Sequence, residues 1–240
     1  DLGDGSQVGM EALVRWQHPQ RGLIAPGEFI PIAEDNGMIA AIDAWVLEQA
    51  CRQMVRWNAE GGGLSFVAVN VSSRLFSRGE LDMKVAQVLA ETGLPPEQLE
   101  LEVTESAIME DPDAAQKLLI SLRALGVRLA IDDFGTGYSS LARLKRLPVD
   151  KLKLDQSFVR GLPDDPEDAA IAHAVIALGK SLGLKVLAEG IEQPAQAAFL
   201  RELGCNYGQG YHFGRPQPVA RAVDATTLSE AKDSPSSTRS

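Results

Sequence analysis

The chain has 240 residues, which suffices for one α/β barrel or for two smaller domains. Its net charge of −10 argues against wrapping duplex nucleic acid, because no basic surplus is available to replace phosphate counterions. A small anionic ligand remains compatible with this charge, since bound metal ions would invert the local sign. No apolar stretch reaches the length of a membrane span and no signal-peptide pattern opens the chain, so we expect no membrane contact by this domain.

Short apolar runs typical of strands alternate with helical patterns along the chain. The strand-like runs cover residues 8–16, 64–72, 99–106, 128–134, 151–158, 184–190 and 207–213. A long helix is expected from about Ile39 to about Asn58, and apolar residues repeat with a helical period after Leu81, Ala115 and Ile171. Strict alternation of strands and helices favours a parallel sheet covered by helices.

Seven strands are one short of a closed eight-stranded barrel. The opening residues, Asp1 to Gly5, form a turn-like sequence that should follow a strand, so we expect the first strand to precede Asp1. We expect one barrel domain over residues 1–228 and a disordered polar tail over residues 229–240. Cys51 and Cys205 are expected to be buried and reduced.

Oxygen-bearing side chains lie at matching places near the ends of five strand-like runs. They are Glu11, Asn70, Glu102, the adjacent pair Asp132 and Asp133, and Glu189. A carboxylate within a buried strand is costly unless a cation compensates its charge. The carboxyl ends of barrel strands meet at one face, where the active sites of such barrels lie. Because the set contains no histidine or cysteine, the sequence predicts a site for Mg²⁺ or Mn²⁺.

Asp132 and Asp133 open the densest of these motifs, which continues to Tyr138 as Phe-Gly-Thr-Gly-Tyr. Adjacent aspartates stay ionised together only beside cations, and one of them can bridge two metals while its neighbour binds the second. Two metals roughly 3.5–4 Å apart can clamp the attacking and leaving oxygens of an in-line displacement at phosphorus. For the dipeptide alone, an exposed turn that uses Asp and Gly for backbone reasons is the better interpretation, but the four other strand-end acids favour the metal site.

Lys151, Lys153 and Asp155 alternate with leucines, so they should share the inward face of their strand. A buried lysine among carboxylates is most simply an ion-pair partner. Beside two metals, however, Lys153 could orient the attacking water and stabilise charge on the phosphoryl oxygens.

Two further charged residues lie close to the predicted site. Glu105, just past a strand end, could accept backbone N–H bonds from the glycine-rich loop after Asp133, or could be an acid at a helix N-terminus. Arg15, on the same predicted strand face as Glu11, could reach a phosphate or serve as a salt-bridge donor.

Together these motifs resemble the EAL domain family of bacterial cyclic di-GMP phosphodiesterases. The signature tripeptide is Glu11-Ala12-Leu13. The resemblance continues in order through Pro26-Gly27-Glu28-Phe29-Ile30-Pro31, Asn70-Val71-Ser72, Glu102-Val103-Thr104-Glu105, Asp132 to Leu141, Lys151 to Asp155, Ala188 to Glu192, and Gln209-Gly210-Tyr211.

The resemblance implies a modified (β/α)8 TIM-type barrel with one antiparallel strand, which hydrolyses cyclic di-GMP to linear pGpG with two Mg²⁺ or Mn²⁺ ions. By this likeness the first metal is held by Glu11, Asn70, Glu102 and Asp132, and the second by Asp132, Asp133 and Glu189. The catalytic residues would be Lys153, Glu189 and Glu105, with Glu105 anchoring the loop after Asp133. The substrate-binding residues would be Leu13, Arg15, Gln209 and Glu192.

The family likeness also implies a wider setting. We expect a homodimer, with the loop 134–139 coupling ligand binding to association through the following stripe of Leu141, Leu144 and Leu147. Sensory or GGDEF domains are expected upstream. The expected location is the bacterial cytoplasm, with any membrane tether supplied by other domains.

Two other functions share parts of this pattern. A catalytically silent cyclic di-GMP receptor would have lost metal ligands, whereas every expected ligand and Lys153 are present. A Mg²⁺-dependent lyase or racemase of the enolase type also places acids and lysines at barrel strand ends. The adjacent aspartates and the lack of an obvious second base favour phosphoester hydrolysis.

Overall fold

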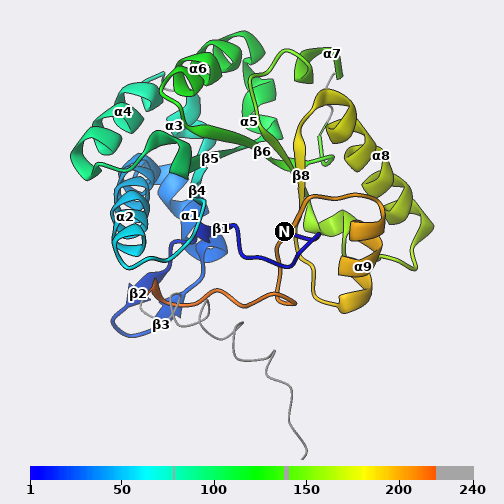
Figure 1. The fold of residues 1–240 in the computed structure, drawn as a ribbon. Helices are drawn as coiled ribbons and strands as arrows, with labels where there is room; N and C mark the ends of the chain where they lie inside the picture. Colours follow the sequence, from blue (N-terminus) through cyan, green and yellow to red (C-terminus); the bar gives the residue numbers. More distant parts are fainter. Residues whose placement is uncertain (78, 138–140, 220–240) are drawn as a thin grey trace, which may run out of the picture.

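Seven strands form one curved sheet in the computed structural model, which describes residues 1–77, 79–137 and 141–219, with the backbone alone for Leu141. In their order across the sheet they are β1 (Gly9–Ala12), β4 (Phe66–Val71), β5 (Leu99–Thr104), β6 (Arg128–Phe134), β7 (Lys151–Leu154), β8 (Lys185–Ala188) and β9 (Tyr207–Gly208). Every neighbouring pair is parallel. The sheet curls into an incomplete ring with helices around its outside (Figure 1), which confirms the α/β barrel class.

The helices follow the strands as the alternating pattern predicts. They are α1 (Pro26–Asn36), α2 (Ile39–Ala59), α3 (Ser73–Ser77), α4 (Leu81–Thr92), α5 (Glu105–Glu110), α6 (Pro112–Ala124), α7 (Leu141–Leu144), α8 (Pro166–Leu182) and α9 (Pro194–Glu202), with short 3₁₀ turns at Pro96–Gln98 and Gln156–Phe158. None of the helices in the described part of the chain is both long and apolar enough to cross a membrane.

Local sequence accounts for the helix ends, as α8 illustrates. The side chain of Asp165 accepts hydrogen bonds from the backbone N–H groups of Glu167 and Asp168, and Pro166 occupies the first turn, where no N–H partner is required. Gly183 ends the helix with a φ of +73°, a conformation that glycine adopts without strain.

The apolar core lies between the sheet and the helices, while the inside of the ring is polar. On β7, Leu152 and Leu154 face the helices and are fully buried, whereas Lys151 and Lys153 point into the ring. The predicted sorting of this strand is therefore confirmed. Cys51 and Cys205 are free and buried, also as expected.

Three predicted strands end well before the expected residue. The run 8–16 breaks after Ala12, and Trp16–His18 (β2) instead pairs with Gly22–Ile24 (β3) in a separate antiparallel hairpin. The run 151–158 ends at Leu154, where the side chain of Asp155 caps a 3₁₀ turn. The run 207–213 ends at Gly208, and Gly210 then packs so tightly against Ile191 that a Cβ atom would lie 2.1 Å from its carbonyl oxygen.

Residues 1–8 cross between the two edges of the sheet. The N–H of Leu2 donates to the carbonyl of Asn206 (3.0 Å) beside β9, and the N–H of Ser65 donates to the carbonyl of Val8 (2.8 Å) beside β1. Figure 1 shows this segment running from the β8 side of the ring to β1. Among the described residues, no strand of the large sheet is antiparallel. The predicted tail 229–240 lies outside the described residues.

Candidate functional site

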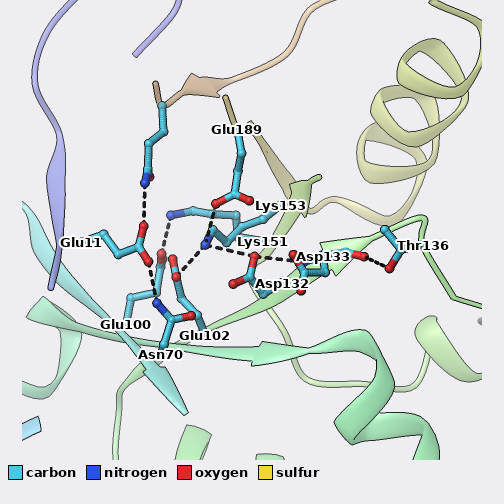
Figure 2. Close-up of polar contacts among 11 residues, drawn as sticks. Glu11, Asn70, Glu100, Glu102, Asp132, Asp133, Thr136, Lys151, Lys153 and Glu189 are labelled. Carbon is cyan, nitrogen blue, oxygen red and sulfur yellow. Dashed lines mark hydrogen bonds and ion pairs between the residues drawn. The ribbon is translucent and has the colours of Figure 1, made fainter. Parts of the chain in front are cut away.

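The predicted acids meet at the carboxyl ends of the strands. Glu11 lies on β1, Asn70 on β4, Glu102 on β5, Asp132 and Asp133 on β6, Lys153 on β7, and Glu189 follows β8 directly. Figure 2 shows their side chains converging inside the ring. The parallel arrangement explains this convergence, because the carboxyl ends of all strands lie at the same face.

Lys153 occupies the centre of this group. Its Nζ lies 2.6 Å from Glu102 Oε2, 3.0 Å from Asp132 Oδ1 and 2.8 Å from Glu189 Oε1. The side chain is 1% exposed, so water screens these ion pairs little. Since an ammonium has three N–H donors, the three carboxylates account for all of them.

The pKa values of several groups in this cluster are shifted from their ordinary values. Burial by itself would lower the pKa of Lys153, but the carboxylates of Glu102 and Glu189 outweigh burial and raise it well above its ordinary value. Burial raises the pKa of Glu102 well above its usual range, against the opposing effect of Lys153. Burial also raises the pKa of Glu189, to about 7, with Lys153 opposing and Asp132 reinforcing the shift. The cluster therefore carries more negative charge than one lysine comfortably compensates.

Three of these acids are arranged as metal ligands. Asp132, Asp133 and Glu189 each offer a carboxylate oxygen, and these oxygens all lie within 4.8 Å of one another. Asp133 has a φ of +53°, which is uncommon for a residue with a side chain and turns the chain sharply after Asp132. Burial and the neighbouring Asp132 raise the pKa of Asp133. The donor set fits a hard divalent cation.

Glu11 joins two other predicted residues. Its Oε1 accepts a hydrogen bond from Asn70 Nδ2 (2.5 Å), and its Oε2 accepts one from Gln209 Nε2 (2.5 Å). These bonds link β1 to its neighbour β4 and to the segment after β9, at the opposite edge of the sheet. All of the side-chain atoms that Glu11 and its neighbour Glu102 offer a cation are oxygens, which again fits a hard divalent ion.

Glu105 is both the acid at a helix N-terminus and the acceptor for the loop after Asp133, the two roles predicted for it. It is the first residue of α5, is 2% exposed, and its Oε2 accepts a hydrogen bond from the N–H of Gly135 (3.0 Å). Its Oε1 accepts no hydrogen bond within the described part of the chain, and a Cβ atom on Gly137 would lie 2.9 Å from it. The carboxylate therefore holds the start of the loop that follows Asp133.

The remainder of this loop falls partly outside the described residues, which exclude 138–140 and the side chain of Leu141. Two leucines of the predicted stripe beyond it have described side chains, and both lie against the barrel. Leu144 is 2% exposed and Leu147 packs against the core, so these two side chains stabilise the barrel itself.

Three predicted substrate-binding residues are not joined to the acidic cluster by any polar contact in the described part of the chain. Arg15 donates to the carbonyl of its neighbour Val14 (2.9 Å), and Leu13 is 40% exposed. Glu192 is exposed, and its backbone N–H donates to Gln196 Oε1 (2.8 Å). The prediction that Arg15 shares the strand of Glu11 is wrong, because β1 ends at Ala12.

A second buried ion pair lies beside the predicted set and was not predicted. Lys151 Nζ lies 2.6 Å from Glu100 Oε1, and both residues are at most 3% exposed. The signal was present in the sequence, since Glu100 and Lys151 each lie two residues before a predicted site residue, on the same strand face.

Fold and site together define a helix-covered parallel barrel whose mouth is lined with carboxylate side chains. More particularly, the chain belongs to the EAL domain family, whose model matches residues 1–216.

Two curated relatives from Pseudomonas aeruginosa are each 51% identical to the chain. One is the bifunctional diguanylate cyclase/cyclic di-GMP phosphodiesterase MucR, aligned over 92% of this chain and 32% of its own length. The other is the cyclic di-GMP phosphodiesterase NbdA, aligned over 91% of this chain and 28% of its own length. The chain thus spans about a third of the length of the curated relatives it matches.

Solved structures match as well. The complex of the PaMucR phosphodiesterase with c-di-GMP is 51% identical, covers 88% of this chain and 85% of its own, and has a TM-score of 0.86. The EAL enzyme Bd1971 in its cAMP and cyclic-di-GMP bound form is 33% identical, covers 94% of this chain and 62% of its own, and has a TM-score of 0.87.

Proposed function

We propose that this chain is a cyclic di-GMP phosphodiesterase that hydrolyses one phosphodiester of its substrate to linear pGpG, with two Mg²⁺ or Mn²⁺ ions. The observation that carries the proposal is the buried group of carboxylates around Lys153, in which Asp132, Asp133 and Glu189 have the spacing of metal ligands. The cyclic di-GMP phosphodiesterases among its relatives supply the substrate.

Six side chains would hold the two ions. The first would be bound by Glu11, Asn70, Glu102 and Asp132, and the second by Asp132, Asp133 and Glu189. Divalent cations bound there would polarise the phosphoryl oxygens and lower the pKa of water. Glu105 supports the second set indirectly, because its bond to Gly135 fixes the chain just beyond Asp133.

Lys153 would act in the reaction through its charge. With the carboxylates that it contacts engaged by cations, its N–H groups would be free to donate to the attacking water and to a phosphoryl oxygen. Glu189, which lies beside Lys153, would accept the proton that the water releases. The high pKa of Lys153 keeps it protonated, so it stabilises charge and does not remove the proton.

The substrate would lie across the mouth of the ring. Arg15 would contact a phosphate and Leu13 would offer an exposed apolar surface. Gln209, which contacts Glu11, and the exposed Glu192 would lie at the edges of the ligand.

Incubating the full 240-residue chain with Mn²⁺ and cyclic di-GMP, and then resolving the products by chromatography, tests the proposal. We expect pGpG to accumulate with the wild type and not with Glu11→Ala or with EDTA. Tight binding of cyclic di-GMP without turnover would instead support the receptor alternative. Membership of the EAL family argues against the enolase-type alternative.

We further propose that residues 1–228 act as one catalytic domain of a longer bacterial signalling protein, located in the cytoplasm and joined to sensory or GGDEF domains. The much greater length of the relatives, one of them bifunctional, supports this setting. A homodimer is also proposed. Sedimentation with and without cyclic di-GMP and Ca²⁺ tests it, and a monomer under both conditions at high protein concentration would rule it out for this chain.

A further inference from the structure

Two ion pairs are stacked inside the ring between the same two strands. Glu102 of β5 pairs with Lys153 of β7 at the mouth, and Glu100 pairs with Lys151 one level deeper (Figure 2). Strand β6 lies between β5 and β7, and it presents the small side chain of Ala130 at this place. The opposing side chains therefore meet across β6 without obstruction.

The strand register places a second carboxylate at the level of Lys151. Glu102 is level with Ala130, and Ala130 is level with Lys151, so Lys151 lies level with Glu102. Two strand spacings separate their Cα atoms by roughly 10 Å, a gap that a lysine and a glutamate can span together across an alanine. Lys151 contacts Glu100, one level lower, just as Lys153 contacts Glu102.

Several groups hold Lys151 in this position. Its Nζ lies 2.6 Å from Glu100 Oε1, 4.2 Å from the centre of the Phe66 ring and 5.3 Å from the centre of the Tyr207 ring. The rings attract a cation weakly, whereas the buried carboxylate carries a full opposite charge. Glu100 is therefore the strongest of the three partners.

We propose that Glu100 is a positioning residue for the metal site, because it keeps the ammonium of Lys151 away from the carboxylate of Glu102. Glu102 already contacts Lys153 and is a proposed ligand of the first metal. A second ammonium on Glu102 would compete directly with a divalent cation. This inference rests on the proposed metal site.

Mn²⁺ titration calorimetry on the full chain, without substrate, tests the inference. Glu100→Gln leaves Lys151 with a neutral partner, so we expect Lys151 to turn to Glu102 and the Mn²⁺ affinity to fall. A mispaired state favoured about ninefold weakens the apparent affinity about tenfold. Lys151→Met removes the competing ammonium, so this control should bind Mn²⁺ within about threefold of the wild type.

The decisive variant combines both changes. If Glu100 acts by restraining Lys151, Glu100→Gln with Lys151→Met should recover the affinity lost in Glu100→Gln. Failure of the double variant to recover, with a folded protein by circular dichroism, overturns the proposal and leaves Glu100 a purely structural role. Unchanged affinity in Glu100→Gln also overturns it, because the aromatic rings would then suffice.

Two other outcomes can be distinguished from failure of the inference: a variant that does not fold, and a wild type that does not bind Mn²⁺. Should Glu100→Gln not fold, Glu100→Asp keeps the charge but shortens the side chain, and it should weaken Mn²⁺ binding in a way that Lys151→Met again reverses. Loss of this reversal contradicts the proposal. If the wild type itself does not bind Mn²⁺, the proposed metal site fails and not the role of Glu100 alone.

Discussion

Lys153 carries one positive charge among three carboxylates, and this imbalance defines the site at the scale of single residues. As a fully buried ion-pair partner, it stabilises the metal-free fold. In the proposed reaction, it would also act on the substrate, because it contacts the same carboxylates that would bind the cations. The structural role concerns the stability of the metal-free protein, whereas the catalytic role concerns the rate of the reaction, so the two can be measured separately.

Lys153→Met should lower turnover far more than it weakens substrate binding. Losing one preorganised charge of this kind costs about 10²–10³ in rate, because the charge acts mainly on the transition state. The metal-free variant should also unfold at a lower temperature, since removing one partner of a buried ion pair costs about 3–5 kcal/mol. Saturating Mn²⁺ should restore much of this loss.

Turnover, substrate affinity and thermal unfolding measured on one preparation would check these expectations. Near-normal turnover together with a lowered melting temperature would show that Lys153 is only a structural partner.

Glu189 should make the stability of the metal-free protein depend on pH. Its pKa is raised from 4.5 to about 7 in the fold, chiefly by burial, so the folded state keeps a proton that the unfolded state releases. Stability from this group is therefore present below pH 4.5 and is lost as the pH rises to about 7. Melting curves in EDTA across this range should show the decline, and Glu189→Gln should reduce it. An equally steep decline in Glu189→Gln would assign the effect to other groups, such as Glu102.

At the scale of elements, α5 and the β6 loop are held together by one carboxylate. Glu105 begins α5, and its bond to Gly135 crosses to the end of β6. Its second oxygen accepts no bond among the described residues, so only half of the carboxylate is needed for the anchor.

Glu105→Gln and Glu105→Leu form a matched pair for this anchor. The glutamine keeps one acceptor oxygen for the N–H of Gly135, so hydrolysis should stay within about tenfold of the wild type. The leucine fills a similar volume without an acceptor, so Asp133 should lose its fixed position and hydrolysis should fall by about 10² or more. Rates at saturating Mn²⁺ would check this, and equal rates in the two variants would contradict an anchoring role.

The sequence predicted the elements that depend on local pattern. Alternation of Leu152 and Leu154 with lysines placed Lys153 inside the ring, and strand-end positions brought the acids together. The β2–β3 hairpin was missed because its three-residue strands are too short to show a period. The partner of Lys151 was missed because it depends on the register between three strands, which no single strand reveals.

At the scale of the whole molecule, Glu11 has a larger structural part than its predicted role as a ligand suggested. Its two hydrogen bonds, to Asn70 and Gln209, link β1 to both β4 and the far edge of the sheet. If repulsion among the acids were the only effect, removing the Glu11 carboxylate would not lower the stability of the metal-free protein. The two hydrogen bonds of Glu11 act in the opposite direction, because they stabilise the fold.

Glu11→Ala should therefore abolish hydrolysis and also lower the melting temperature without metal. Hydrogen bonds to charged groups contribute about 1.5–3 kcal/mol, which corresponds to several degrees for a chain of this size. The rise in melting temperature on adding Mn²⁺ should be smaller than in the wild type, because one ligand is lost. Thermal scans with Mn²⁺ and with EDTA would measure both effects. An unchanged Mn²⁺ response would remove Glu11 from the proposed metal site.

The hydrogen bond between Glu11 and Gln209 closes the ring with the same carboxylate that a cation would take. Binding of a cation would then break this hydrogen bond, and chelation of the cation would restore it. The segment after β9, including the N–H of His212 that bonds to Ile191, would become a local reporter of occupancy. Its amide hydrogens should exchange faster with Mn²⁺ than with EDTA, while those of β5 stay protected. Equal exchange in both states would mean that the hydrogen bond between Glu11 and Gln209 persists when the cation binds.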